Sequence, residues 1–283
     1  MKVLGLVASP RKSGNSEILV KEMLAAMPAD VEKEMIRLTS LDIKLCSACY
    51  ACLPGGKCCV IKDDLEFLLD RIKAADAVVI AAACYFLGPH TTIKTINDRL
   101  VSVLAESAAF TGKRCVTAVT YGVPGWDGFA RESVNNFARF LHLEVVGNML
   151  VQAASPGEVV RPEILAAARE LAGKLLSPAP SDPGLPGVIT CRQCGSSLLQ
   201  LTPDGQARCV MCGSHGQLKP VAGGFAIDYA PDGHIRFSPS GLAAHSRLLE
   251  EIKQQFIATR TELAQRRKPY SEFDWWVQPN RAD

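Results

Sequence analysis

The chain has 283 residues, a formal net charge of +2, and 48% apolar and 21% charged side chains. This is the composition of a globular protein with one large or two smaller domains, and its near-neutral charge excludes the strongly basic surface of a nucleic-acid binder. The apolar run Ala77–Leu87 is too short to span a membrane. The apolar N-terminus runs into Arg11 without a signal-peptide cleavage site, so we expect a cytoplasmic protein. In that reducing compartment, 11 cysteines indicate metal ligands or redox groups rather than disulfides.

The first unit of the chain predicts a strand, a polar loop and a helix. Lys2–Ala8 is short and β-branched, Ser9–Ser16 is rich in serine and glycine, and Glu17–Met27 has apolar residues at helical spacing. The free N–H groups of a helix N-terminus favour phosphate binding. The alternative is an ordinary capped helix, with Asn15 or Ser16 as its N-cap.

The same alternation continues to residue 176. Strands are predicted at Val31–Leu38, Ala77–Ala83, Arg114–Thr120 and Glu144–Val151, and helices at Asp64–Ala75, around Ile93–Leu104, at Gly128–Leu141 and at Arg161–Leu176. Alternating strands and helices predict an α/β fold: a flavodoxin-like, five-stranded parallel sheet with helices on both faces.

Ligands bind such sheets beyond the carboxyl ends of the strands. Three loops follow those ends: Ser9–Ser16, Cys84–His90 and Tyr121–Trp126. The first suits a phosphate, and the other two carry aromatic side chains that could frame a flat ring. This combination predicts a bound mononucleotide, FMN. His90 could shuttle a proton there, although a solvated loop histidine is the simpler interpretation.

A cysteine-rich stretch follows the second predicted strand. Cys46, Cys49 and Cys52 have the spacing C-x2-C-x2-C, and Cys58 and Cys59 follow a Pro-Gly-Gly turn. Soft thiolates at this spacing favour an iron–sulfur cluster. Reactive thiols or a zinc site are the alternatives, although zinc knuckles usually come as more widely separated pairs.

Residues 1–176 resemble the NADPH-dependent FMN reductase family of the flavodoxin superfamily. The matching segments are Ser9-Pro-Arg-x-x-Gly-Asn-Ser16, Tyr85-Phe86, Lys94-x-x-x-Asp98-Arg99 and Tyr121-Gly122, and the cysteine stretch followed by Val-Ile-Lys-Asp-Asp is similar to the iron–sulfur flavoprotein branch. The resemblance implies FMN, a 4Fe–4S cluster and a homodimer or homotetramer. The implied phosphate contacts are Ser9, Arg11, Ser13, Asn15 and Ser16, and the implied ring contacts are Tyr85, Phe86, Leu87, Gly88, Tyr121, Gly122 and Gly125.

The sequence departs from this family at two places. Cys84 stands where proline is common, and we interpret it as a small packing residue. Either Cys58 or Cys59 can be the fourth cluster ligand, depending on the end from which the motif is aligned.

The proline-rich stretch 177–187 predicts an extended linker. A second cysteine motif follows in residues 188–237: Cys191, Cys194, Cys209 and Cys212 form two C-x2-C-G knuckles. This pattern predicts a four-thiolate metal site of the zinc-ribbon kind. Zinc is favoured, and iron, as in rubredoxin, is the alternative.

The remaining segment, 238–283, predicts a long helix and an aromatic tail. Gly224–Tyr229 and His234–Phe237 are expected to form a hairpin. A helix capped by Ser238 or Ser240 is expected to reach Arg267, with an apolar stripe packed on its own protein. The tail around Trp275 and Trp276 could wrap a neighbouring subunit or dock on the first domain.

The leading hypothesis is an iron–sulfur flavoprotein oxidoreductase that exchanges electrons with NAD(P)H or ferredoxin. We find no acid–base or nucleophile constellation, which suits electron transfer. The alternatives are an NAD(P)H-dependent FMN or quinone reductase without a cluster, and a metal-stabilised interaction protein on a flavodoxin-like scaffold.

Overall fold

The computed structural model describes residues 1–53, 59–178, 184–185, 187–231, 235–273, 275 and 277. Cys58, most of the predicted linker, the turn residues up to His234 and Trp276 lie outside the described residues. Among those described, no helix has both the length and the apolar character needed to cross a membrane.

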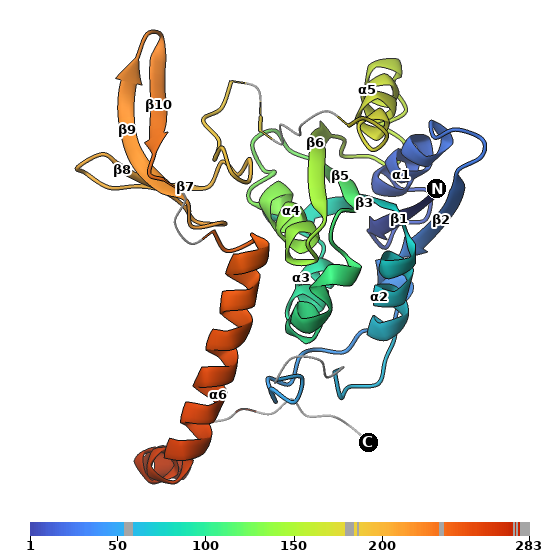
Figure 1. The fold of residues 1–283 in the computed structure, drawn as a ribbon. Helices are drawn as coiled ribbons and strands as arrows, with labels where there is room; N and C mark the ends of the chain where they lie inside the picture. The colour runs from blue at the N-terminus through green and yellow to red at the C-terminus, as the bar shows by residue number, and fades with distance from the viewer. Residues whose placement is uncertain are drawn as a thin grey trace.

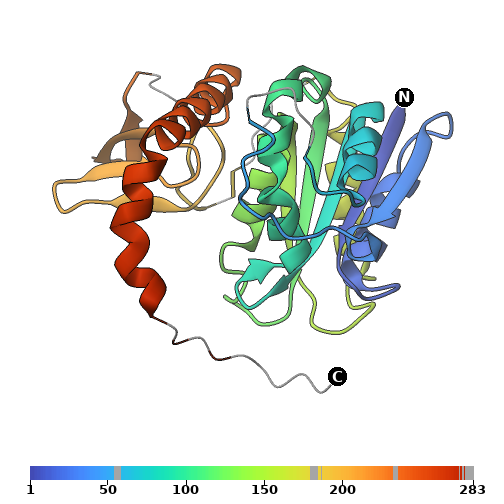
Figure 2. The same cartoon turned by 90° about the horizontal axis from the view of Figure 1, so that it is seen from below.

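A parallel sheet organises the first part of the chain (Figures 1 and 2). Its strands are β1 (Lys2–Ala8), β2 (Glu32–Arg37), β3 (Ala77–Tyr85), β5 (Arg114–Tyr121) and β6 (Glu144–Gln152), in the order β2-β1-β3-β5-β6. All these pairings are parallel. This is the flavodoxin-like order, which confirms the predicted fold class. A short strand, β4 (Gly88–Pro89), folds back antiparallel on β3.

Helices cover both faces of the sheet. One face carries α1 (Asn15–Ala25) and α5 (Pro162–Gly173), and the other carries α2 (Leu65–Ala74), α3 (Thr91–Asn97), the 3-10 helix η2 (Leu100–Ala109) and α4 (Ala130–Phe140). Alternate residues of β1 point to opposite faces. Leu4 and Leu6 therefore join the core under α2–α4, and Val3 and Val7 join the core under α1 and α5.

The predicted helix around Ile93–Leu104 is divided in the structure. The regular helix α3 ends at Asn97, and η2 begins at Leu100. The predicted apolar face is still buried, from Ile93 to Leu104. Between the two helices, the Arg99 side chain turns away toward the cysteine-rich stretch.

A second, antiparallel sheet follows in the order β10-β9-β8-β7. Its strands are β7 (Leu199–Leu201), β8 (Gln206–Cys209), β9 (His215–Val221) and β10 (Gly224–Tyr229). We call residues 188–237 the C-terminal module. In Figure 1 its β9–β10 hairpin extends away from the parallel sheet.

The predicted hairpin between Gly224–Tyr229 and His234–Phe237 is wrong. β10 pairs with β9 on its N-terminal side, with Gly224 opposite Val221. Gly223 has a φ of 86° and supplies the tight turn that joins them. Ile235 and Phe237 pack instead against the four cysteines of the module.

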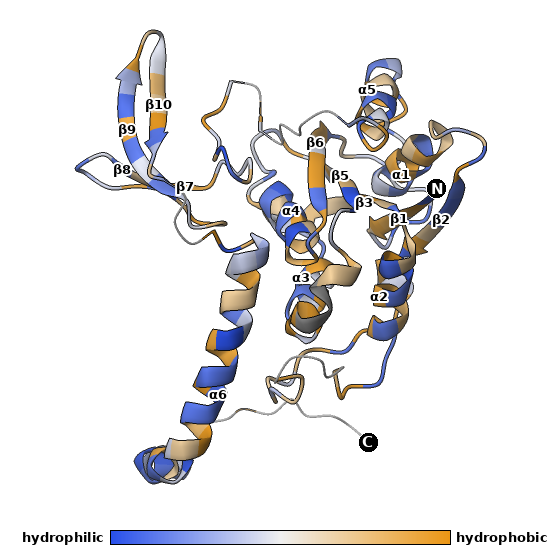
Figure 3. Cartoon of the chain, viewed as in Figure 1, coloured by the Kyte–Doolittle hydropathy of each residue, from blue (hydrophilic) through white to orange (hydrophobic). Residues whose placement is uncertain are grey.

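The 29-residue helix α6 (Pro239–Arg267) leaves the module, followed by the 3-10 helix η3 (Lys268–Glu272). Ser238 caps α6 as predicted, because its hydroxyl accepts a hydrogen bond from Gly241 N. Of the predicted apolar stripe, Leu242 is buried, and Leu249 and Leu263 are half-buried. Leu248, Ile252, Phe256 and Ile257 remain 44–51% exposed, and Figure 3 shows apolar residues along the open length of the helix.

An acidic residue, Glu17, ties the first helix to the neighbouring strand. Its carboxylate accepts hydrogen bonds from Ser13 N at 2.6 Å, from Lys21 Nζ at 2.7 Å and from Arg37 Nη2. Arg37 Nη1 also donates to the Ser9 and Arg11 carbonyls, each at 3.0 Å. These bonds hold the Ser9–Ser16 loop. The Lys21 hydrogen bond, followed by those from Arg37 and Ser13 N, outweighs burial and lowers the pKa of Glu17 to about 2.

We predict that Gly5→Ala destabilises the protein, because α1 lies directly against this residue of β1. An added Cβ would lie 2.4 Å from Val20 Cγ1 and 3.1 Å from Leu24 Cδ1. We expect a loss of ~1–3 kcal/mol in the free energy of unfolding, measured by thermal denaturation. Gly173→Ala is the control, because nothing beyond the neighbouring backbone of its own helix lies within 4 Å of its Cβ position. Equal melting temperatures for the two variants would show that the contact is not restrictive.

We also predict that Glu17→Gln removes an acid-sensitive contribution to stability. The folded-state pKa of about 2 lies below the ordinary value of 4.5, so the carboxylate stabilises the fold above about pH 4.5 and loses this effect as the pH falls toward 2. Denaturant titrations should show a difference on the order of 2 kcal/mol between wild type and variant at pH 7. The difference should shrink between pH 4.5 and 2.

The control for the Glu17 experiment is Glu163→Gln, which removes a carboxylate that is 69% exposed on α5. A difference for Glu17→Gln that does not change with pH would contradict the ionic explanation.

Candidate redox and metal sites

Three loops meet at the carboxyl edge of the parallel sheet, as predicted. They follow β1, β3 and β5, which are neighbours in the sheet. The first is Ser9–Ser16, in which Ser13 has a φ of 53° and Gly14 caps α1. In the described part of the chain, the side chains of Ser9, Arg11 and Ser13 make no hydrogen bond, so they are available to a ligand.

Two of the predicted phosphate ligands use their side chains to build the site. Asn15 Nδ2 donates to the Ala153 and Ser155 carbonyls at 3.1 and 3.0 Å, and its Oδ1 accepts from Gly157 N at 2.9 Å. Ser16 Oγ pairs with Thr120 Oγ1 at 3.2 Å. The Asn15 amide is fully engaged by these contacts, and both residues also lie in the first turn of α1, whose backbone N–H groups can reach a phosphate.

The second loop is a tight turn between β3 and β4. Phe86 and Leu87 have φ values of 49° and 67°, and Phe86 is 92% exposed. Left-handed backbone at two bulky residues costs of order 1–3 kcal/mol each and is concentrated at functional sites. The turn carries Tyr85, which is 42% exposed, to the same edge.

Three other predicted ring contacts lie at the third loop, and one, Gly88, lies in the β3–β4 turn. Tyr121 ends β5, Gly122 packs near Ala154, and Gly125 adopts a φ of 74° that suits glycine. Gly88 pairs with Tyr85 in the β3–β4 turn. Cys84 Sγ faces the Trp126 carbonyl at 3.5 Å, which agrees with a packing role.

His90 does not support the proton-shuttle hypothesis. Its Nδ1 accepts from Thr92 N at 3.3 Å and caps α3, and burial lowers its pKa. The ring also contacts Tyr85 edge-on. Its contacts therefore explain it as a structural residue.

We call residues Cys46–Cys59 the cysteine loop. Most of its described residues, together with Asp98, Arg99 and Val101, line a cavity of about 340 Å³. The four described cysteines of this loop all line it: Cys46, Cys49, Cys52 and Cys59. Ala48 and Tyr50, which separate the first cysteines, have φ values of 50° and 52°. Both residues therefore have left-handed backbone, and a turn follows at residues 51–53. Thiolates gathered around one cavity are the donor set that an iron–sulfur cluster requires.

A buried ion pair fixes both ends of the cysteine loop. The side chains of Arg99 and Asp63 form an ion pair and are each 1% exposed. Arg99 Nη1 donates to the Lys44 carbonyl at 3.2 Å, and Asp63 accepts from Lys44 N at 2.9 Å, both before the loop. Arg99 Nη2 donates to Cys59 Sγ at 3.3 Å and to the Ile61 carbonyl at 3.4 Å, at its far end.

The role of Arg99 in holding the two ends of the cysteine loop is not predicted from the sequence. Arg99 is named there only as part of a segment that matches the family. The available signal was an arginine within an apolar helical face, between Ile96 and Leu100. Burial alone raises the pKa of Asp63, but the hydrogen bonds from Arg99, Lys44 N and Leu65 N lower it overall. Asp63 therefore remains a carboxylate that balances the guanidinium.

The second cysteine motif forms a compact, buried site, which we call the knuckle site. The sulfur atoms of Cys191, Cys194, Cys209 and Cys212 all lie within 4.8 Å of one another. Gly195 N donates to the Cys191 carbonyl at 2.7 Å, and Gly213 N donates to the Cys209 carbonyl at 3.0 Å, which closes the two knuckles. Four convergent thiolates with no open position match a structural metal site.

The module with this knuckle site is docked on α4. Arg131 Nη1 donates to the Gly195 carbonyl at 3.1 Å, and Glu132 accepts from Ser197 N and Oγ at 3.2 and 2.8 Å. Both α4 side chains are buried. Sequence reasoning did not identify this contact, because only the tertiary structure brings residues so distant in the chain together.

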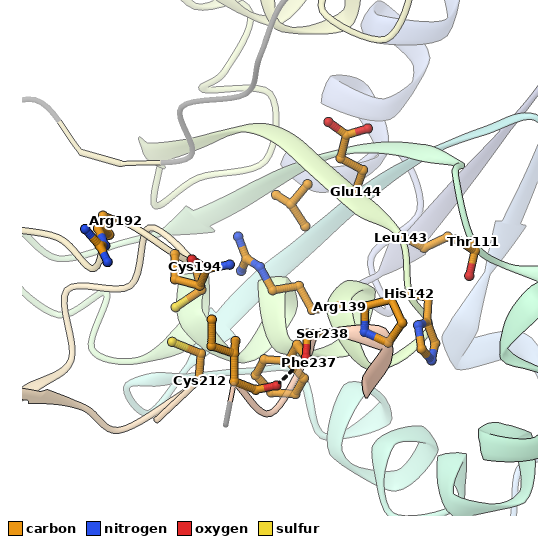
Figure 4. A pocket seen from close by; sticks show the side chains of 14 residues that line it. Thr111, Arg139, His142, Leu143, Glu144, Arg192, Cys194, Cys212, Phe237 and Ser238 are labelled. Carbon is orange, nitrogen blue, oxygen red and sulfur yellow. Dashed lines mark hydrogen bonds between the residues drawn. The ribbon is translucent and has the colours of Figure 1, made fainter. Parts of the chain in front are cut away.

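A cavity of about 370 Å³ lies between the module and the end of α4. Arg139 enters it beside Cys194 (Figure 4). Burial lowers the pKa of Arg139, whereas the neighbouring Cys194 and Cys212 act in the opposite direction. A guanidinium at this position favours the anionic, metal-binding form of the thiols.

Comparison with known proteins identifies the family. The profile of the NADPH-dependent FMN reductase family matches residues 1–155. An iron–sulfur flavoprotein of Methanocaldococcus jannaschii is 37% identical over 35% of this chain and 51% of its own length. Iron–sulfur flavoproteins of Archaeoglobus fulgidus and Methanosarcina thermophila are 29% and 28% identical over 56% and 52% of this chain, and 72% and 78% of their own lengths.

Among solved structures, a flavone reductase superposes with a TM-score of 0.78 at 20% identity. The match covers 99% of this chain and 100% of that one, so the two share a fold that includes the C-terminal part. The chain spans only about half the length of the Methanocaldococcus relative. The family profile nevertheless covers more than half of the 283 residues, and the chain therefore belongs to the NADPH-dependent FMN reductase family of flavin-dependent oxidoreductases, with iron–sulfur flavoproteins among its relatives.

Proposed function

We propose that the protein is an iron–sulfur flavoprotein that moves electrons between NAD(P)H or ferredoxin and an acceptor through FMN and a 4Fe–4S cluster. The observation that carries the proposal is the cavity lined by Cys46, Cys49, Cys52 and Cys59 in a chain of the FMN reductase family. Bound FMN would accept an electron pair from a hydride donor and release the electrons one at a time, and an iron–sulfur cluster would take them singly, so the two cofactors together can connect these kinds of partner.

The residues at the carboxyl edge of the sheet fit FMN. Ser9, Arg11 and Ser13 have side-chain donors free for the phosphate in the described chain, and the first N–H groups of α1 add to them. Asn15 and Ser16 would contribute through the backbone, while their side chains hold the loop. The proposed ring contacts are Tyr85, Phe86, Leu87, Gly88, Tyr121, Gly122 and Gly125.

The residues of the cysteine loop fit an iron–sulfur cluster, with Cys59 as the fourth ligand. Cys59 lines the same cavity as the other three cysteines and receives an N–H···S hydrogen bond from Arg99. Such bonds stabilise thiolate ligands and tune cluster potentials. Cys58 lies outside the described residues, so the preference rests on the contacts of Cys59.

We propose zinc for the knuckle site, since its four buried thiolates leave no open position. In this assignment residues 188–237 form a metal-stabilised module joined to the flavin domain, 1–176, by the linker 177–187, and residues 238–283 form the helix and tail. We also propose a homodimer or homotetramer, in which the exposed stripe of α6 would be covered.

The test is a cofactor analysis of anaerobically purified protein. We expect one FMN, four iron and four sulfide ions per chain, as in one 4Fe–4S cluster, and one zinc. NAD(P)H or reduced ferredoxin should reduce the flavin. FMN without sulfide would reject the cluster and leave an FMN or quinone reductase. Absence of FMN would leave the scaffold interpretation.

A pair of adjacent substitutions identifies the fourth ligand. Cys59→Ala should lose most of the sulfide while retaining FMN, because the cluster cysteines are separate from the flavin loops. Cys58→Ala is the matched control and should retain both cofactors. The reverse result would assign the ligand to Cys58.

A further inference from the structure

The helix α6 contacts the cysteine loop through one lysine. Lys253 Nζ donates to the Tyr50 carbonyl at 2.9 Å and to the Leu53 carbonyl. Leu53 N donates to the same Tyr50 carbonyl at 3.1 Å. The ammonium group therefore closes a turn that contains Cys52 and directly follows Cys49.

This lysine is an unusual source of support for the loop. Among the described residues, Lys253 makes the only hydrogen bonds that reach residues 46–53 from elsewhere in the chain. The stretch Lys44–Tyr50 is exposed, and left-handed backbone at Ala48 and Tyr50 costs of order 1–3 kcal/mol at each residue. A loop with this conformation needs an external contact to hold it. The Arg99–Asp63 pair acts only at its two ends.

The other end of α6 is fixed to the knuckle site. Ile235 and Phe237 pack on the four cysteines, and Arg236 N donates to the Cys212 carbonyl at 3.0 Å. At Gly241 the helix passes so close to this segment that a Cβ would lie 1.9 Å from the Ile235 carbonyl oxygen. Lys253 lies 14 residues after Pro239, or roughly 21 Å along the helix. The helix contacts η2 of the first domain on the way (Figure 2).

We propose that Lys253 is a positioning residue for the cysteine loop, and that α6 makes the geometry of the cluster site depend on the knuckle site. The proposal rests on the proposed function, because it concerns the loop that would hold the cluster. Lys253 orients Cys49 and Cys52 through the backbone and places a positive charge beside the thiolates. A nearby cation stabilises the reduced, more negative cluster, so its removal lowers the reduction potential.

The test compares Lys253→Met with Arg260→Met. Both remove one cation from α6, but Arg260 is exposed and makes no hydrogen bond or ion pair in the described chain. For Lys253→Met we expect iron loss to a chelator about tenfold faster than in wild type, the order expected when a charge-assisted hydrogen bond is lost. We also expect a lower cluster midpoint potential in an EPR-monitored titration. Arg260→Met should match wild type in both.

A second measurement does not need the cluster. In protein freed of iron, amide hydrogen exchange of residues 46–53 should be faster in Lys253→Met than in wild type or Arg260→Met. Equal exchange and equal iron loss in the two variants would overturn the proposal. If purified wild type lacks iron and sulfide, the proposed function fails, but the exchange comparison still decides whether Lys253 positions the loop.

The dependence on the knuckle site has its own test. Gly241→Ala displaces α6 from Ile235 and should also speed iron loss, because it moves Lys253. The effect should vanish in the Lys253→Met background, since both substitutions act on one contact. Fully additive effects would show that α6 does not transmit the change.

Discussion

The ion pair between Arg99 and Asp63 is the contact on which the proposed redox centre depends. It is buried, it receives or donates hydrogen bonds on both sides of the cysteine loop, and its guanidinium reaches Cys59. Loss of one partner would leave an unpaired buried charge, which typically costs about 3–5 kcal/mol. The cysteine loop is largely exposed, and the ion pair fixes the positions of the residues at which it begins and ends. The parallel sheet supplies the rigid support, because Arg99 lies between two helices packed on its core.

The two cysteine sites differ in burial and in what holds their cysteines in place. The knuckle site is compact and buried, with sulfur atoms already close enough to share one ion. Its knuckles are closed by their own glycine N–H groups, and the rest of the module packs around them. The cysteine loop has two exposed and two half-buried thiols around an open cavity, and it relies on side chains from outside the loop: Asp63, Arg99 and Lys253. The knuckle site therefore organises its own surroundings, whereas the proposed redox site is held by the rest of the chain.

The attachment of the C-terminal module follows from buried charges as well. Arg131 and Glu132 on α4 bind the Gly195–Ser197 backbone and side chains, and Arg139 lies beside the thiols. These residues fix the module against the face of the sheet opposite α1. From there α6 extends along the first domain with most of its apolar stripe exposed. Neither the exposed apolar residues of α6 nor the exposed Phe86 packs against the core of this chain.

The sequence by itself determined the parallel sheet, the loops at its carboxyl edge and both cysteine motifs, because these depend on local periodicity and spacing. The alternation of Lys2–Ala8 with Glu17–Met27 and its repeats predicts the flavodoxin-like class. The two C-x2-C-G pairs of this chain close into knuckles as their spacing predicts. The sequence contains two candidate glycine turns, one on each side of Gly224–Tyr229, and the prediction chose the second. In the structure Gly223 joins β9 to β10, so the hairpin predicted after Tyr229 is wrong. Only the tertiary structure decided that Asn15 braces a loop rather than offering its side chain to a phosphate, that Arg99 belongs to the cysteine loop, and that Lys253 reaches it from 200 residues away. Such contacts join polar groups that have no fixed separation in the chain, so sequence spacing does not predict them. They form because polar groups that become buried when the core packs require hydrogen-bond partners.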